Sequence, residues 1–297
     1  MKNMPVYLDY NATTPVLPEV VEAMLPYLTD HFGNPSSAHI YGRTAREGVE
    51  AARGEVAALL GCEPDEIFFT SGGTEANNLA IRGAAEAAHG KRQIITSVVE
   101  HPATTNPCGW LERHGYEVTR LAVDSTGRVD MHGASALVRE GTVLLTVMHA
   151  NNEVGTLQPV RELGEIAHTR GALVHTDAAQ SVGKVPVDVA ALGVDLLSVA
   201  GHKLYAPKGV GALYVKRGTP IKPFNLGAGH ERGLRPGTEN VASIVGLGRA
   251  CAIARRTMAG ESARVQGVRD HLWDLLKTGV PGIELNGHPT ERLPNTL

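Results

Sequence analysis

Short apolar runs alternate with segments of helical spacing along most of the chain, and this pattern predicts its fold. The runs that predict strands are residues 67–70, 93–98, 116–121, 143–148, 172–176, 195–199 and 210–215. Helical spacing fills residues 75–88, 104–114, 131–139 and 160–169. Strands that lack polar alternation and are separated by helices predict an α/β fold with a mainly parallel, seven-stranded sheet between helices. The last strand follows its predecessor after too short a link for a crossover, so we expect it to run antiparallel.

Further helices and strands are predicted toward the two ends of the chain. Pro18 and the apolar spacing after it predict a first helix, and residues 42–60 predict a second that ends at Gly61. A short strand is predicted at residues 6–10 and a long helical region at residues 240–278. Beyond this region the chain ends on what resembles the entry to another strand. Because an unpaired edge would result, we expect the C-terminal domain to be incomplete.

The amino-acid composition mainly excludes classes of protein and of partner. The 297 residues are 42% hydrophobic and 20% charged, which is typical of a soluble globular protein. A net charge of −3 gives no reason to expect a nucleic-acid partner, and no apolar run is long enough to predict a membrane span. The three cysteines, Cys62, Cys108 and Cys251, are too widely spaced for a disulfide framework or a zinc site. We therefore expect no metal and a cytoplasmic location.

Lys203 is the first candidate for chemistry. It lies in a turn between the last two predicted strands, and a lone lysine there is ordinarily a surface charge. Its neighbours Gly201, His202, Leu204 and Tyr205 instead indicate that the amine points into a site. A desolvated amine beside other cations loses its proton more readily, and a neutral amine can attack a carbonyl carbon.

A second candidate is the segment from Ile67 to Asn78, which predicts a strand, a Gly-Gly turn and a helix start. Backbone amides at Gly73 and the Thr74 hydroxyl would form a phosphate site there, supported by the helix dipole. The alternative is a capping box in which Ser71 or Thr74 only caps the helix. The spacing matches neither a Walker A loop nor a dinucleotide fingerprint.

Other polar residues follow separate predicted strands. Asp177 would pair with a heterocyclic cation, with Gln180 as a hydrogen-bond donor, or would merely cap the next helix. His101 and Asn152 have the same ambiguity between structural and functional roles. Because these residues and Lys203 all follow strand ends, one site would gather them. A phosphate cradle, a buried aspartate, a stacking histidine and a reactive lysine together predict pyridoxal 5′-phosphate as cofactor.

Longer runs resemble the NifS/IscS-type cysteine desulfurases of the class V aminotransferase group, which are pyridoxal-phosphate enzymes of fold type I. The matching runs, in the family's order, are Tyr7-Leu-Asp-Tyr-Asn-Ala-Thr-Thr-Pro15, Gly33-Asn-Pro-Ser-Ser37, Thr70-Ser-Gly-Gly-Thr-Glu-Ala-Asn-Asn78, Glu100-His-Pro102, Asn151-Asn-Glu-Val-Gly155, His175-Thr-Asp-Ala-Ala-Gln180, Gly201-His-Lys203 and Arg235-Pro-Gly-Thr-Glu-Asn240. They cover nearly the whole chain.

The resemblance implies roles at the reacting end of the cofactor. Lys203 would form the internal aldimine and move the substrate Cα proton. His101 would stack on the ring and handle protons at the substrate thiol. Asp177 would pair with the ring nitrogen, and Asn152 and Gln180 would bond on the ring-hydroxyl side.

It also implies how the phosphate is held and how the chain is organised. Thr74, the Gly73 backbone and His202 would hold the phosphate, and Thr238 would reach the phosphate of the neighbouring subunit in a homodimer. The fold-type I division would place residues 1–15 with the small α+β domain, residues 16–257 in the large cofactor-binding domain, and residues 258–297 at the start of the incomplete small domain.

The implied activity converts L-cysteine to L-alanine and passes sulfur as a persulfide to an acceptor or scaffold protein, for iron–sulfur cluster or thio-cofactor assembly. Alternatives are a selenocysteine lyase or another class V lyase, and a non-catalytic cofactor-binding partner in sulfur assembly.

Two features depart from the family pattern. Ala200 stands where the family usually has a serine, and Ser198 is a doubtful substitute for that phosphate contact. The family's nucleophilic cysteine lies beyond the position of Leu297, and none of the three cysteines present matches it. We therefore expect this chain to lack the nucleophile and to fail in persulfide transfer.

Overall fold

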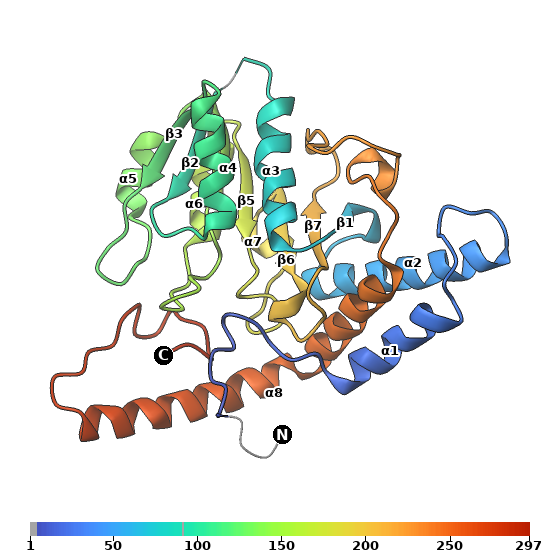
Figure 1. The fold of residues 1–297 in the computed structure, drawn as a ribbon. Coiled ribbons are helices and arrows are strands. Elements are labelled where there is room, and N and C mark those ends of the chain that lie inside the picture. The colour runs from blue at the N-terminus through green and yellow to red at the C-terminus, as the bar shows by residue number, and fades with distance from the viewer. Residues whose placement is uncertain (1–4, 91) are drawn as a thin grey trace.

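A seven-stranded sheet forms the centre of the computed structural model, which describes residues 5–90 and 92–297 (Figure 1). In spatial order the strands are β1 (Ile67–Thr70), β7 (Gly211–Val215), β6 (Leu196–Ala200), β5 (Leu173–Asp177), β4 (Thr142–Thr146), β2 (Gln93–Ser97) and β3 (Glu117–Leu121). β7 is antiparallel to both of its neighbours, and all other pairs are parallel. The seven predicted strands and the direction of the last one are confirmed.

Helices cover both faces of this sheet. They are α1 (Pro18–Thr29), α2 (Ile40–Leu60), α3 (Gly73–Ala87), α4 (Pro102–Arg113), α5 (Met131–Leu137), α6 (Val160–Thr169), α7 (Val189–Leu192) and α8 (Val241–Gly279). Short 3₁₀ turns are η1 (Pro64–Glu66), η2 (Gly201–Lys203) and η3 (Glu231–Gly233). Gly61 ends α2 at φ 72°, a left-handed conformation that favours glycine, as the sequence predicts.

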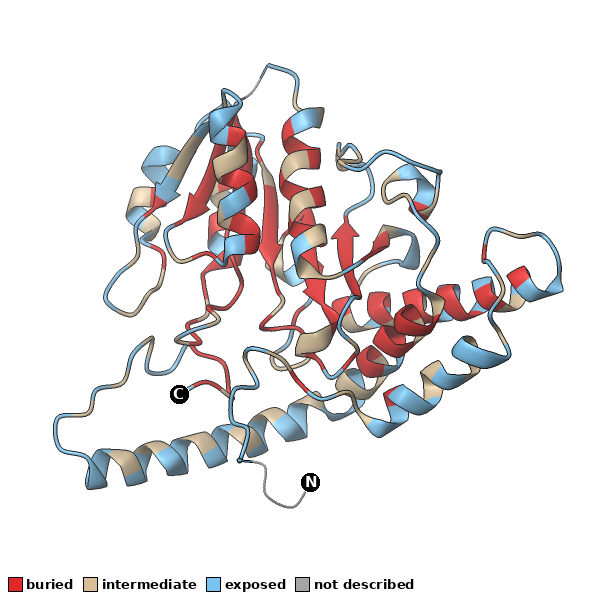
Figure 2. Cartoon of the chain, in the orientation of Figure 1, coloured by how far each residue is buried: buried red, intermediate tan, exposed pale blue. Residues whose placement is uncertain are grey.

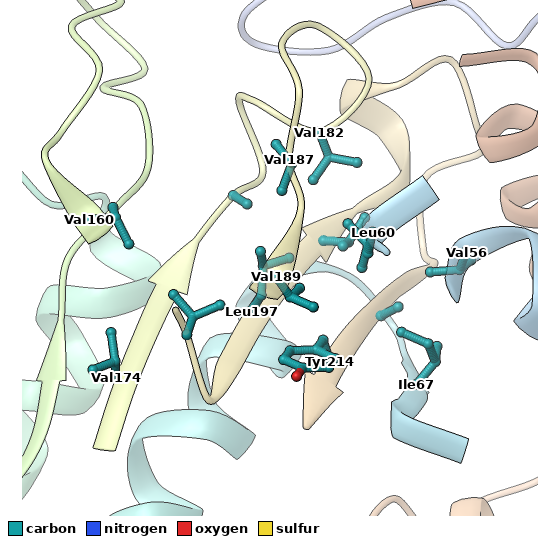
Figure 3. Packing of buried hydrophobic residues seen from close by; sticks show 14 of the residues in the cluster. Val56, Leu60, Ile67, Val160, Val174, Val182, Val187, Val189, Leu197 and Tyr214 are labelled. Carbon is teal, nitrogen blue, oxygen red and sulfur yellow. The ribbon is translucent and has the colours of Figure 1, made fainter. Parts of the chain in front are cut away.

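Successive side chains of a strand point to opposite faces of the sheet, and in every strand except the edge strand β3 both sets of side chains are largely buried. In β1, Phe68 packs in the core beneath α3 and α4, whereas Ile67 and Phe69 pack in the larger core on the other face. Figure 2 shows the strands as a largely buried layer, and Figure 3 shows part of the larger core, where Leu197 and Tyr214 lie near Leu60 of α2. This two-sided burial explains why these strands lack a regular alternation of apolar and polar residues.

The parallel strands bring their carboxyl ends to one edge of the sheet. Asp177, the last residue of β5, pairs with Ser198 of β6, and Thr146, the last residue of β4, pairs with His175 of β5. β1 is antiparallel to β7, as is β6, so β1 also ends at this edge and passes into α3 there. This edge is where an α/β sheet ordinarily binds its ligand.

The strand predicted at residues 6–10 is wrong. The structure has irregular backbone and a turn there, with Val6 84% and Leu8 81% exposed. The apolar side chains have no neighbouring strand to pair with, and an isolated strand is not stable.

The strand expected near the C-terminus is also absent from the described residues. After α8 the chain is irregular, and Arg292 forms only a single antiparallel bridge with Thr156. The side chain of Arg292 instead donates to the carbonyl oxygens of Val154 and Thr296. The domain boundary predicted at residues 257 and 258 lies inside the continuous α8 and stays a prediction. In the described part of the chain, no helix is long and apolar enough to cross a membrane.

Candidate active site

A cavity of about 410 Å³ lies at the carboxyl edge of the sheet. Eight of the nine predicted site residues line it: Gly73, Thr74, His101, Asn152, Asp177, Gln180, His202 and Lys203. They come from five segments that each follow a different strand, and the structure brings these segments together around one cavity. The ninth, Thr238, is exposed in the segment between η3 and α8 and does not line this cavity.

The amine of Lys203 is held at the cavity by main-chain oxygens of the N-terminal segment. Its Nζ donates to the carbonyl oxygen of Asn11 and, at 2.9 Å, to that of Ala12. Burial lowers the pKa of Lys203 from its ordinary value, although the negative charges of Asp177 and Asp9 oppose this shift. A lowered pKa makes the neutral, nucleophilic amine easier to reach.

Asp177 presents a fixed carboxylate to the cavity although its side chain is largely buried. Its Oδ1 accepts a hydrogen bond from the backbone N–H of Ala179 at 2.9 Å, and its Oδ2 accepts one from Asn77 Nδ2 at 2.6 Å. Residues 179–184 form turns, and the N-cap residue of the next helix, α7, is Asp188. The alternative that Asp177 caps the next helix is therefore wrong.

The start of α3 leaves its N-terminal end open toward the cavity. Gly72 is the N-cap residue and supplies no side-chain cap, so capping by Ser71 or Thr74 is not what the structure shows. The Ser71 N–H donates instead to the carboxylate of Glu75, which also pairs with Arg235 at 2.9 Å. The first-turn N–H groups and the dipole of a 15-residue helix favour an anion here.

His101 is the N-cap residue of α4. Its Nδ1 accepts a hydrogen bond from the backbone N–H of Ala103 at 3.1 Å. In the neutral ring this bond places the proton on Nε2. The ring lines the cavity in a defined tautomer, with a donor available on Nε2.

Glu100, which precedes His101, is a buried carboxyl that the sequence did not mark. It accepts hydrogen bonds from Ser97 Oγ at 2.6 Å and from the Met148 N–H at 2.9 Å. Burial raises the pKa of Glu100 to about 8, although the two hydrogen bonds lower it. The negative charge of Asp177 adds to the rise. The side chain thus joins the segment that carries His101 to the end of β4.

We expect Glu100→Gln to flatten the pH dependence of stability between about pH 4.5 and pH 8. In that window the folded state keeps a proton that the unfolded chain has lost, so stability of the original protein falls as pH rises. Glutamine keeps a carbonyl acceptor and does not ionise. Urea unfolding at pH 5 and pH 8 measures the effect, with the exposed Glu86→Gln as control. An unchanged difference between the two pH values would contradict this prediction.

Sequence reasoning missed three residues beside the cavity. The carbonyl oxygen of Asn11 accepts from both Lys203 Nζ and Gln180 Nε2, and its side chain bonds to Asn152, Asn295 and Thr296. Lys184 donates to Gln180 Oε1 at 3.1 Å, and burial beside Lys203 lowers its pKa to about 8. Asn77 bonds to Asp177. Asn11 and Asn77 lie within the runs quoted above, but nothing in their spacing revealed these long-range contacts.

The two departures from the family pattern have structural counterparts. Ser198 is fully buried and hydrogen-bonds to His175 Nε2 at 3.0 Å, so it does not replace the serine absent at Ala200, which lines the cavity.

All three cysteines are reduced and lie away from the cavity lining. Burial raises the pKa of Cys62 and of Cys108 to about 12, and raises that of Cys251 as well. Their thiols are poor nucleophiles.

The comparisons with known proteins agree with this geometry. The profile of the aminotransferase class-V family matches residues 6–297. A cysteine desulfurase IscS from Dictyoglomus turgidum is 49% identical over 293 residues, which cover 98% of this chain and 74% of that protein.

Solved structures give the same result. One described as a NifS-like protein superposes with a TM-score of 0.94 at 41% identity, over 98% of this chain and 80% of that one. Another, described as SspA in complex with cysteine, has a TM-score of 0.80 at 44% identity, over 83% of this chain and 72% of that one. The chain belongs to the aminotransferase class-V family, among the cysteine desulfurases of the NifS/IscS type.

Proposed function

We propose that this protein binds pyridoxal 5′-phosphate in the cavity at the sheet edge and uses it to break the C–S bond of L-cysteine; the sulfur would pass to a thiolate of an acceptor as a persulfide, and L-alanine would be the other product. The observation that carries the proposal is the arrangement of three groups around one cavity. These are the amine of Lys203, the carboxylate of Asp177 and the open N-terminus of α3. An aldehyde, a ring N–H and a phosphate need these three partners.

The residues present fit this cofactor. A volume of about 410 Å³ lies within the range of cavities that hold small cofactors. The cradle at the start of α3 is narrow, because a Cβ on Gly73 would come within 3.2 Å of the Ala200 Cβ. Only a backbone without a side chain leaves this approach fully open, which suits a phosphate bound by main-chain N–H groups.

The cofactor, when bound, supplies a ring that withdraws electrons from the substrate Cα. Lys203 would hold the aldehyde carbon and move the proton at Cα. Asp177, whose side chain is largely buried, would keep the ring nitrogen protonated through an ion pair. His101, which lines the cavity, would stack on the ring and exchange a proton with the substrate sulfur.

The remaining positions supply binding. Gly73, Thr74 and His202 would hold the phosphate, while Asn152 and Gln180 would bond on the ring-hydroxyl side. Burial and the charges of Lys203, Lys208 and Lys184 lower the pKa of His202, so its ring is more readily neutral. As a neutral ring it would serve the phosphate as a hydrogen-bond donor rather than as a second cation.

Features outside the cavity complete the proposal. Thr238 would act in the neighbouring subunit of a homodimer, in agreement with its exposed position away from this cavity. We further propose a cytoplasmic location and delivery of sulfur to an acceptor or scaffold protein for iron–sulfur or thio-cofactor assembly, a role that the likeness to cysteine desulfurases supports.

The test is an absorbance titration of the purified chain with pyridoxal 5′-phosphate, followed by addition of L-cysteine. With an added thiol present to accept the sulfur as a persulfide, we expect a cofactor band that L-cysteine shifts, and alanine as the product; L-serine, which differs only in oxygen for sulfur, should yield no alanine. A folded sample without a cofactor band would refute the proposal. Turnover of selenocysteine without turnover of cysteine would instead assign a selenocysteine lyase.

A further inference from the structure

Asn77 is fully buried one turn below the open end of α3. Thr74 and Asn77 are three residues apart and so lie on the same side of the helix. The helix that presents the phosphate cradle therefore also carries an amide toward the floor of the cavity. Its Nδ2 donates to Asp177 Oδ2 at 2.6 Å and to Thr104 Oγ1 at 3.3 Å.

The orientation of this amide follows from its partners. If the side chain were flipped, its oxygen would face the carboxylate of Asp177, and two acceptors would repel one another. The observed orientation leaves Asn77 Oδ1 buried without a hydrogen-bond partner among the described residues. Leaving a buried carbonyl unpaired is unfavourable. An apolar side chain would fill the same space without leaving a carbonyl unpaired. The presence of an amide here therefore indicates that its hydrogen bond to the Asp177 carboxylate is needed.

We propose that Asn77 is a positioning residue that holds Asp177 as an oriented carboxylate for the ring nitrogen of the cofactor; the inference rests on the proposed function. Asp177 Oδ1 is held by the Ala179 N–H and Oδ2 by Asn77, so the carboxylate has no freedom to rotate. Hydrogen bonds to both oxygens fix the orientation of the carboxylate that an ion pair with the ring requires. Asn77 acts only through Asp177, because it does not line the cavity.

The experiment compares two probes, pyridoxal 5′-phosphate and its 1-deaza analogue, in which carbon replaces the ring nitrogen. Dissociation constants are measured by absorbance for the original protein, Asn77→Leu and Asn77→Ala. Asn78→Leu is the matched control, because Asn78 is the next residue of α3 and its amide bonds to the Thr74 carbonyl instead. We expect Asn77→Leu to weaken pyridoxal 5′-phosphate about tenfold and to leave the analogue within about twofold. Asn78→Leu should leave the ratio between the two probes unchanged.

A double-mutant cycle tests whether Asn77 acts through Asp177, which a purely structural role of Asn77 would not require. In a chain that carries Asp177→Asn, we expect Asn77→Leu to cause no further loss of pyridoxal 5′-phosphate affinity. Equal weakening of both probes, additive losses in the cycle, or unchanged affinity would each overturn the role of Asn77. Asn77→Leu should fold, since it also removes the unpaired oxygen, and Asn77→Ala gives the same comparison if leucine does not fit.

Failure of the proposed function is recognised separately. If the original protein bound neither probe, both the function and this role would be refuted. The side-chain amide resonance of Asn77 in the cofactor-free protein would then still report the contact itself. It should shift in Asp177→Asn if the hydrogen bond exists, and should stay in place if it does not.

Discussion

Lys203→Ala is expected to abolish covalent attachment of pyridoxal 5′-phosphate and to lower alanine formation at least about 1,000-fold. The amine lies at the cavity, held by the carbonyl oxygens of Asn11 and Ala12, and burial lowers its pKa. The measurement is reduction with borohydride, which makes an amine–aldehyde linkage permanent, followed by mass spectrometry of the peptides. The added mass should lie on the peptide that contains Lys203.

Two other lysines supply the controls. Lys208 is exposed five residues further along, and Lys208→Ala should keep the modified peptide. Lys184 is the stricter comparison, because burial and the nearby charge of Lys203 lower its pKa to about 8. Its Nζ is bonded to Gln180 Oε1, and Lys184 is not among the residues that line the cavity. Modification of the Lys184 peptide in place of the Lys203 peptide would contradict the assignment of the reactive amine.

The fold was predictable because all of its strands except the edge strand β3 are buried on both faces. Residues 210–215, for example, contain no charged or hydrogen-bonding side chain except Tyr214, as is typical of a strand covered on both faces by helices. The same signal misled at residues 6–10, where Val6 and Leu8 are apolar yet exposed. The local sequence pattern shows which side chains are apolar, but it does not show whether a partner strand is present. Short apolar runs are therefore the weakest evidence for a strand.

The site was predictable as far as its residues lie at strand ends. Asp177 and His101 follow strands, and the ends of parallel strands meet at one edge. Asn77 and Asn11 could not be assigned in this way. Asn77 reaches a carboxylate 100 positions away, and Asn11 reaches an amine 192 positions away. Such contacts depend on how α3 and the N-terminal segment pack on the sheet. The spacing of asparagines along the sequence does not predict them.

Glu231→Gln is expected to lower the free energy of unfolding by about 3–5 kcal/mol. Glu231 and Arg53 form an ion pair of 2.8 Å whose side chains are only 2% and 4% exposed. The Glu231 carboxylate also accepts the backbone N–H of Phe69 in β1 at 2.8 Å. Burial alone would lower the pKa of Arg53, but the bonds and charge of Glu231 hold it above its ordinary value. Removing the anion therefore leaves a buried cation without its main partner.

Urea unfolding measures this loss, and two further variants decide its cause. Asp65→Asn breaks the exposed pair of Asp65 and Arg217 and should change the unfolding midpoint little. The double variant Arg53→Met with Glu231→Leu removes both charges and should recover part of the loss, although the Phe69 N–H stays unpaired. A loss in Glu231→Gln as small as that in Asp65→Asn would show that the buried pair does not hold the segment around η3 against β1.

Glu231 itself adopts φ 44°, a left-handed conformation that is unfavourable for a residue with a side chain. The ion pair helps to offset that strain, and together with the bond from Arg232 to the Ile67 carbonyl oxygen it holds the segment that leads to Thr238.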